Sequence, residues 1–290
     1  MKKYLEKISK KKWLIMVIMA ILVASIFFVL VKKYGTQYSI QSEIKIGWVT
    51  DIHADRFKKR DVDSGKLYPI KYTEYLPKAF DAMKADGVNV VIATGDNTNS
   101  GDDNYARDIK KITDEKKMDV LWVKGNHDNG EVMNILGVPA PYYYFKDYGN
   151  TRIVVLNSTE YQNDEYNYEG GIGQEQLTWL REVLKTEKKI IVAMHIPIFD
   201  SEIEKNNIHD LKGEFFGVGN IFEKFVELEN ILKEKGNVKM VLSGHWHVMW
   251  KKEYNGINYF GQSALTRDGG MGAYGTIKLE GYQLDYKFAN

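Results

Sequence analysis

The stretch Ile44-Lys45-Ile46-Gly47-Trp48-Val49-Thr50-Asp51-Ile52-His53 places an aspartate and a histidine directly behind a run of mostly apolar residues. A short run of apolar and β-branched residues that gives way to polar ones is typical of a buried strand followed by a loop. The stretch therefore predicts a strand over Ile44–Thr50 that delivers Asp51 and His53 to the edge of a sheet.

Further apolar runs along the chain predict the rest of an α/β domain. The six candidate strands are Ile44–Thr50, Val88–Thr94, Val120–Lys124, Ile153–Asn157, Ile190–Met194 and Lys239–Ser243. Between them, apolar residues three or four apart predict helices that each bury one face. These faces are Leu76, Phe80 and Met83; Leu177, Leu180 and Leu184; and Phe225, Leu228 and Leu232. In the sequence after Trp250 we expect hairpins, with turns at Asn255-Gly256 and Glu280-Gly281. We expect one domain over residues 44–290.

Five of the predicted strands end in short polar clusters, which hold five of the six histidines of the chain. The clusters are Asp51-Ile52-His53, Gly95-Asp96-Asn97, Gly125-Asn126-His127-Asp128, His195-Ile196-Pro197 and Gly244-His245-Trp246-His247. In an open α/β sheet the carboxyl ends of the strands form the ligand crevice. One such cluster would be an ordinary structural feature, but five of them predict a single functional site.

The residue types and spacing of these clusters suit a metal site. In Asp51-x-His53 and His245-x-His247, residues i and i+2 of an extended backbone point the same way, so both can face one ion. The glycine that begins three of the clusters allows a sharp turn and a close approach of the backbone. Imidazole and carboxylate ligands without thiolate suit Mn, Fe or Zn, and the chain contains no cysteine.

The ordered motifs D-x-H, G-D-x-x-N, G-N-H-D, H-x-P and G-H-x-H resemble those of the calcineurin-like metallophosphoesterase superfamily, over residues 46–265. The resemblance implies a four-layer sandwich, in which two facing mixed β-sheets are flanked by helices. It also implies two divalent transition metal ions. Carried over residue by residue, the first ion would be held by Asp51, His53 and His247, the second by Asn126, His195 and His245, and both by a bridging Asp96.

The same resemblance implies hydrolysis of a phosphomonoester or phosphodiester by a hydroxide that bridges the two ions. The catalytic residues would be Asp96 and His127, which matches the family histidine that acts on the leaving group without binding metal. Two dications, two aspartates and one hydroxide sum to a charge of about +1, which attracts a phosphate oxyanion. A side-chain nucleophile is not needed, and no G-x-S-x-G motif is present.

Two other functions stay open at this point. A non-catalytic, metal-binding extracellular module would keep the ligands, but it would have no use for His127. An extracellular nuclease would need a basic surface. The formal net charge is only +1, and six lysines lie within the first twelve residues, so the remainder is slightly acidic. No specific nucleic acid partner is therefore indicated.

Several residues near the motifs have two interpretations. Purple acid phosphatases resemble this set but carry a tyrosine where this chain has Asn99, so an Fe(III)–tyrosinate is not expected; many relatives carry an aspartate there. Asn97 and Arg267 are candidate substrate contacts, and a planar guanidinium suits phosphate, although Arg267 also fits a surface or salt-bridged residue. His209 fits either a flap over the site or a solvated loop. Tyrosines 142–144, 161, 166 and 168 could line a pocket or serve as structural aromatics.

The N-terminal residues predict a membrane anchor. A basic cytoplasmic segment (1–12) precedes nineteen uncharged residues (13–31), and a polar linker (32–43) follows. At about 1.5 Å per residue, a helix over 13–31 is about 28 Å long, close to the roughly 30 Å of bilayer hydrocarbon. The lysine excess predicts a single-pass protein of the cell membrane with an extracytoplasmic catalytic domain. A cleaved signal peptide and a core helix are the alternatives, but an Ala-x-Ala site and a polar stripe are both missing.

We expect protease added to intact cells to digest residues 44–290 and to spare the extreme N-terminus, because the lysine asymmetry keeps only that end in the cytoplasm. Immunoblots against tags at both ends check this. Digestion that requires cell lysis would contradict the topology. A mature N-terminus between residues 25 and 45 would instead indicate a cleaved signal.

Overall fold

The computed structural model describes residues 44–62, 65–160, 170–197 and 225–289, which fall in one compact unit, Ile44–Asn290. The basic segment, membrane helix and linker expected in residues 1–43 lie outside the described residues and stay predictions. Within the described ranges, no helix is long and apolar enough to cross a bilayer.

The first sheet has the strand order β13-β12-β1-β4-β5. Its strands are β1 (Ile46–Val49), β4 (Val90–Ala93), β5 (Asp119–Trp122), β12 (Ala273–Lys278) and β13 (Gln283–Phe288). Strands β1, β4 and β5 are parallel to one another, whereas β12 and β13 run antiparallel to their neighbours. The carboxyl ends of β1, β4 and β5 therefore lie at the same edge of the sheet.

The second sheet has the order β10-β11-β9-β8-β7-β6. Its strands are β6 (Tyr144–Tyr148), β7 (Thr151–Val155), β8 (Lys189–Ala193), β9 (Val238–Ser243), β10 (Trp250–Tyr254) and β11 (Ile257–Gly261). Strands β7, β8, β9 and β11 form a parallel core with antiparallel β6 and β10 at its edges. A separate hairpin joins β2 (Arg60–Val62) to β3 (Gly65–Leu67). All six predicted strands are confirmed, and so are the turns at Asn255-Gly256 and Glu280-Gly281.

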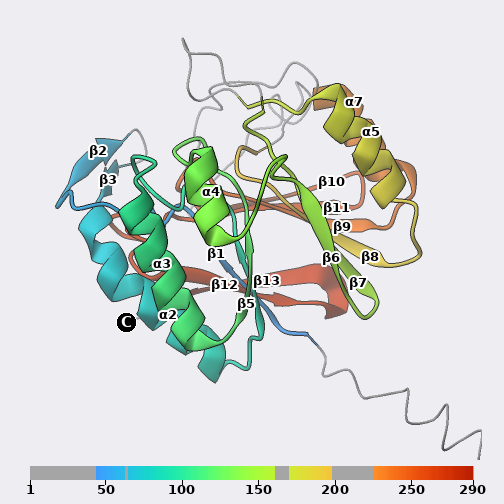
Figure 1. The fold of residues 1–290 in the computed structure, drawn as a ribbon. Helices are drawn as coiled ribbons and strands as arrows, with labels where there is room; N and C mark the ends of the chain where they lie inside the picture. Colours follow the sequence, from blue (N-terminus) through green and yellow to red (C-terminus); the bar gives the residue numbers. More distant parts are fainter. Residues whose placement is uncertain (1–43, 63–64, 161–169, 198–224, 290) are drawn as a thin grey trace, which may run out of the picture. The chain divides into compact units, whose positions relative to one another are not determined.

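Helices cover the outer face of each sheet (Figure 1). The first sheet carries α2 (Tyr72–Ala85), α3 (Asp103–Lys116) and α4 (Gly130–Leu136), and the second carries α5 (Gln174–Val183) and α7 (Phe225–Glu234). The short 3-10 helices are η2 (Pro69–Lys71) and η3 (Glu280–Tyr282). The three predicted helical faces lie in α2, α5 with its C-cap Leu184, and α7.

The strands alternate their side chains between two apolar cores. In β1, Ile46 and Trp48 point into the core between the two sheets, whereas Val49 belongs to the core under the helices. Such alternation is the period of two expected for a strand buried on both faces. The layers therefore run helices, sheet, sheet, helices, as the resemblance implies.

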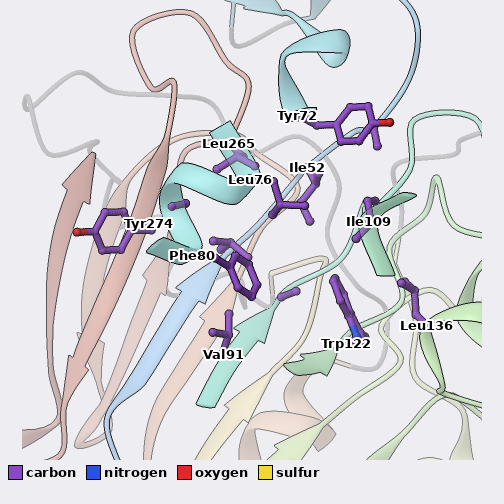
Figure 2. Close-up of a cluster of buried hydrophobic side chains, with 14 of the residues drawn as sticks. Ile52, Tyr72, Leu76, Phe80, Val91, Ile109, Trp122, Leu136, Leu265 and Tyr274 are labelled. Atoms are coloured by element: carbon purple, nitrogen blue, oxygen red, sulfur yellow. The ribbon is translucent and has the colours of Figure 1, made fainter. Parts of the chain in front are cut away.

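The core under α2, α3 and α4 reaches the first polar cluster. Figure 2 shows Leu76 and Phe80 of α2 in one buried cluster with Val91 of β4 and with Ile52. Ile52 is only 1% exposed, and burying such a side chain contributes about 1.5–3 kcal/mol. The apolar residue between Asp51 and His53 thus fixes their loop to the core.

The second sheet contains a tight contact that allows a test of its packing. Trp250 and Gly261 are direct partners in β10 and β11, and a Cβ at Gly261 would overlap the Trp250 ring. Gly261→Ala should lower the free energy of unfolding by about 1–3 kcal/mol, the usual cost of overpacking. Urea denaturation of the full chain measures it.

In a Trp250→Leu background the same alanine should cost much less, because the ring that it overlaps has gone. Effects of the alanine on the unfolded chain are common to both backgrounds and cancel. An equal cost in both backgrounds would show that the strain arises elsewhere.

Candidate metal centre

The loops that follow β1 and β4 run side by side. The amide of Asp51 donates to Gly95 O at 3.0 Å, and that of His53 donates to Asp96 O at 2.8 Å. The D-x-H and G-D motifs are therefore held together by the backbone, before any side chain interacts.

The second sheet supplies His195, His245 and His247 to the same place. Gly244 N donates to His195 O at 3.0 Å, which joins the loops after β8 and β9. The contact with the first sheet is direct, since His245 N lies 3.1 Å from Asp51 Oδ2. Carboxyl ends of strands from both sheets thus meet at one site, as the five clusters predict.

Four of the predicted ligands form one group whose ligand atoms all lie within 4.8 Å of one another: Asp51, His53, Asp96 and His247. His247 Nε2 lies 3.0 Å from His53 Nε2 and 3.2 Å from Asp51 Oδ1. Asp96 Oδ2 lies 3.5 Å from His53 Nε2. This is the set expected for the first ion, with the bridging aspartate.

A second group contains Asp96, His195 and His245. Asn126 belongs with it, because its Oδ1 lies 2.9 Å from His195 Nε2 and 3.1 Å from His245 Nδ1. Asp96 is common to both groups. All seven predicted ligands are therefore brought together, in the two sets that the resemblance implies.

The donor atoms of the second group fit a cation. A backbone carbonyl only accepts hydrogen bonds, so the 2.8 Å contact from His195 Nδ1 to Thr94 O places the ring proton on Nδ1. Nε2 of His195 then faces two acceptor oxygens, Asn126 Oδ1 at 2.9 Å and Asp96 Oδ2 at 3.2 Å, and it can meet them either as a protonated imidazolium or, once that proton is lost, as the ligand of an ion. Buried acceptors that face one another need a cation between them. Metal-bound histidines commonly donate their other ring N–H to a carbonyl, as His195 does.

Electrostatics keep both aspartates ionised in this buried site. Burial alone would raise the pKa of Asp51, but His247 holds it well below its ordinary value. His195 does the same for the pKa of Asp96, again against the effect of burial. Two buried carboxylates without a lysine or arginine partner among the described residues call for compensating positive charge.

The histidines differ in how they respond to the same surroundings. Burial lowers the pKa of His53 to about 4 and the pKa of His245 to about 3. Burial also disfavours the charged form of His195, but the Asp96 carboxylate outweighs it and raises the pKa of His195 to about 9. His53 and His245 thus present neutral imidazoles, the form that binds metal.

The backbone of the ligand loops is left-handed, and the expectation of extended backbone at D-x-H and H-x-H was wrong. The φ angles are 50° at Asp51, 46° at His53, 46° at Asp96, 70° at His245 and 58° at His247. Residues other than glycine rarely adopt such backbone angles, which cost about 1–3 kcal/mol each. The paired side chains converge through sharp turns of the loops rather than through the alternation of a strand.

Two of the glycines permit the close approach that was expected of them. A Cβ at Gly125 would overlap the backbone nitrogen of Asp96, and one at Gly244 would overlap the Thr50 hydroxyl and the Asp51 carboxylate. The loops after β5 and β9 can therefore pack against the ligands only with glycine at these positions.

His127 lies beside the ligands without joining either group. Its backbone N–H donates to Asp96 Oδ1 at 2.9 Å, and its Nδ1 donates to the backbone carbonyl of Asn99 at 2.7 Å. Its ring packs edge-to-face on His53, with centroids 5.0 Å apart. His127 is half-buried. The arrangement separates this histidine from the other four of the site, as expected.

The Asn97 side chain makes hydrogen bonds within the protein, whereas a contact with substrate was predicted for it. It is fully buried, and its amide donates to Val123 O at 3.0 Å and to Asp128 Oδ2 at 2.9 Å. Asp128 accepts further hydrogen bonds from the backbone of Gly125 and Thr98. Asp128 thus ties the loop after β4 to the loop after β5.

The remaining candidates lie at or beyond the margin of the site. The backbone of Arg267 pairs with that of Leu67 in an isolated β-bridge, and its side chain lies against the β2–β3 hairpin. Its contact with substrate stays a prediction. Tyr144 donates to Trp122 O at 3.1 Å, and Tyr143 packs on Trp179, so both have structural contacts. His209 and tyrosines 161, 166 and 168 fall outside the described residues.

Two threonines of the site were missed. Thr50 donates to Asp51 Oδ2 at 2.6 Å, and Thr94 accepts from Trp48 Nε1 through its hydroxyl and from His195 through its carbonyl. Each lies just after a strand, β1 or β4, and directly before a polar cluster, where the sequence pattern assigns a β-branched residue to the strand. The available signal was a position shortly before an aspartate, since Thr50 directly precedes Asp51 and Thr94 lies two residues before Asp96.

Comparisons of sequence and fold relate this chain to known proteins. The profile of the family described as calcineurin-like phosphoesterase matches residues 44–249. A probable cyclic nucleotide phosphodiesterase of Fibrobacter succinogenes is 24% identical over 213 residues, which span 70% of this chain and 73% of that protein. A 3',5'-cyclic-nucleotide phosphodiesterase of Nostoc sp. is 23% identical over 229 residues, which span 75% and 77%.

The fold has a solved counterpart. A dimetal phosphatase from Danio rerio superposes with a TM-score of 0.66 at 15% identity, covering 84% of this chain and 95% of that one. At such identity the likeness shows the fold, and the family is shown by the profile match, which spans more than half of the 290 residues. The chain belongs to the calcineurin-like phosphoesterase family and is a metal-dependent hydrolase of phosphoric esters.

Proposed function

We propose that this chain hydrolyses a phosphodiester with two divalent transition metal ions (Mn, Fe or Zn). One observation carries the proposal: two groups of buried or half-buried ligand residues share the carboxylate of Asp96. When bound, such a pair of ions lowers the pKa of water and neutralises charge on the phosphoryl group. The chain's own contribution is to hold the ligand atoms together and to place a proton donor beside them.

The ligands divide between the two sheets of the sandwich. Asp51 and His53 follow β1, and His247 follows β9; with Asp96 they would hold one ion. Asn126, His195 and His245 would hold the other with Asp96. Thr50 and Thr94 orient Asp51 and His195 through hydrogen bonds.

His127 is placed to deliver a proton to the leaving oxygen. Because Nδ1 donates to Asn99 O, Nε2 is the ring atom left to meet a substrate. A protonated Nε2 can donate to the oxygen that departs from phosphorus. A protein that only binds metal has no use for this histidine, so its position favours catalysis over the non-catalytic module.

The relatives favour cyclic nucleotides as the first substrates to test, since two of them are named for cleavage of that class. The sequence of residues 13–31 supports a single membrane anchor, and the lysines before it support a catalytic domain outside the cytoplasm. The substrate would then be an extracytoplasmic phosphodiester.

Asp96→Asn should abolish activity and release at least one ion, because the carboxylate charge common to both groups is lost. The full chain should contain close to two transition metals by elemental analysis after purification. Asp61→Asn is the matched control, since the Asp61 side chain is 77% exposed. A single tightly bound ion with full activity would refute the two-metal proposal.

His127→Ala should retain both metals but lose activity in proportion to how badly the leaving oxygen needs a proton. General acid catalysis contributes about 10²–10⁴-fold, so hydrolysis of 3',5'-cAMP, with its alkoxide-like leaving group, should fall within that range. Hydrolysis of bis(p-nitrophenyl) phosphate, whose leaving group departs readily as an anion, should fall far less. Equal losses of kcat on both would remove the general-acid role and leave His127 a binding residue.

A further inference from the structure

We propose that Arg60, on the β2–β3 hairpin, is a positioning residue that orients His127 through Asn99. The inference deepens the proposed function, because it assumes the role given there to His127. It concerns a residue that lies outside all five polar clusters and holds none of the proposed metal ligands.

The orientation of the His127 ring depends on one peptide group. Its Nδ1 donates to Asn99 O at 2.7 Å, which is the only hydrogen bond of this ring within the described ranges. The edge-to-face contact with His53 limits the tilt of the ring but gives no directional bond. A rotation of the Asn99 peptide would therefore turn the imidazole and displace Nε2.

The Asn99 backbone is in turn fixed by the hydrogen bond from its N–H to Ala54 O at 3.2 Å and by two bonds of its side chain. Asn99 Nδ2 donates to Asp55 Oδ2 at 3.0 Å, and Asn99 Oδ1 accepts from Arg60 Nη1 at 2.6 Å. Asn99 and Asp55 are 8% and 3% exposed, so the bond between them is shielded from water, and the bond from the half-buried Arg60 is partly shielded. Hydrogen bonds to a charged partner are roughly twice as strong as neutral ones.

An amide is the side chain that suits this position. It donates toward the Asp55 carboxylate and accepts from the Arg60 guanidinium at the same time. An aspartate, which many relatives have here, would oppose the buried carboxylate of Asp55. The Asn99 side chain therefore binds both neighbours, while its backbone carbonyl accepts the bond from His127.

The hairpin that carries Arg60 is itself fixed to the rest of the domain. Arg60 pairs with Leu67, which is fully buried, and Tyr68 N donates to Thr266 O at 3.0 Å. Asp268 N also donates to Lys66 O at 2.8 Å. The guanidinium thus extends from an anchored strand, and the hairpin, Asn99 and His127 form one continuous series of contacts.

The test uses Arg60→Met, which keeps the length of the side chain but removes the donor. Misplacement of a catalytic group by about 1 Å can cost around 10²-fold. We expect kcat on 3',5'-cAMP to fall about 10- to 100-fold, and kcat on bis(p-nitrophenyl) phosphate to fall less than about threefold. Asn99→Ala, which keeps the carbonyl but loses both side-chain bonds, should behave alike. Arg60→Lys should recover part of the loss.

The control is Arg56→Met, an exposed arginine four residues earlier with no side-chain hydrogen bond in the described structure. It should leave both rates unchanged. Metal content and thermal unfolding of each variant establish that the fold is retained. The decisive variant is Arg60→Met combined with His127→Ala, which should be no slower than His127→Ala alone, because Arg60 acts only through His127.

The proposal would be overturned if the rate losses of Arg60→Met and His127→Ala multiplied in the double variant. It would also be overturned if Arg60→Met lowered kcat equally on the two esters. A measurement that does not depend on turnover tests the positioning of His127 separately from the proposed function. In long-range ¹H–¹⁵N spectra of the Zn-loaded full chain, His127 should be protonated at Nδ1, and Arg60→Met should shift it toward a mixture of tautomers. Unchanged His127 signals would refute the positioning role, even if the wild type cleaved no ester and the proposed function had failed.

Discussion

Two aspartates that stay ionised in a buried pocket are the constraint on which the rest of the structure depends. Asp51 and Asp96 face imidazole nitrogens at 3.2–3.7 Å, and His195 faces the amide oxygen of Asn126 at 2.9 Å. So many buried oxygens at one point are unfavourable without positive charge. The surrounding fold holds them in place by two means. Parallel strands from both sheets end at this point, and neighbouring loops are joined by backbone hydrogen bonds such as Gly244 N to His195 O. Left-handed backbone at five ligands is tolerated because these contacts fix it.

The parts of this arrangement that rest on local pattern could be predicted from the sequence. The run before Asp51 alternates side chains between two cores, and its strand, expected over Ile44–Thr50, occupies Ile46–Val49. The polar clusters follow the strands because parallel strands end at a common edge. The division of the ligands into two sets came from the resemblance and not from spacing, yet the geometry reproduces it, with Asn126 beside His195 and His245.

The parts that depend on contacts between distant segments could not be predicted. Asn97 looks like a polar residue beside a ligand, and only the fold shows that Asp128, 31 positions away, binds its amide in the core. The spacing of D-x-H correctly predicted that Asp51 and His53 face the same site, but for the wrong reason. A period of two applies to strands, whereas these residues lie in turns with left-handed backbone. Asp55 continues the alternation of Asp51 and His53, but its partner Asn99 lies 44 positions further along. Nothing in the pattern around Arg60 indicates that its side chain reaches Asn99.

The distance along the chain between the ligands has a consequence for how the protein folds. His53 and His247 touch, although 194 positions separate them, and closing so long a loop has an entropic cost that must be met before the contact forms. We therefore expect the centre to form late in folding, after the inter-sheet core has brought β1 and β9 together. Ions that bind it recognise only the native state, and they stabilise that state by mass action as their concentration exceeds the dissociation constant. The availability of metal would then set not only the activity of the enzyme but also the lifetime of its folded form.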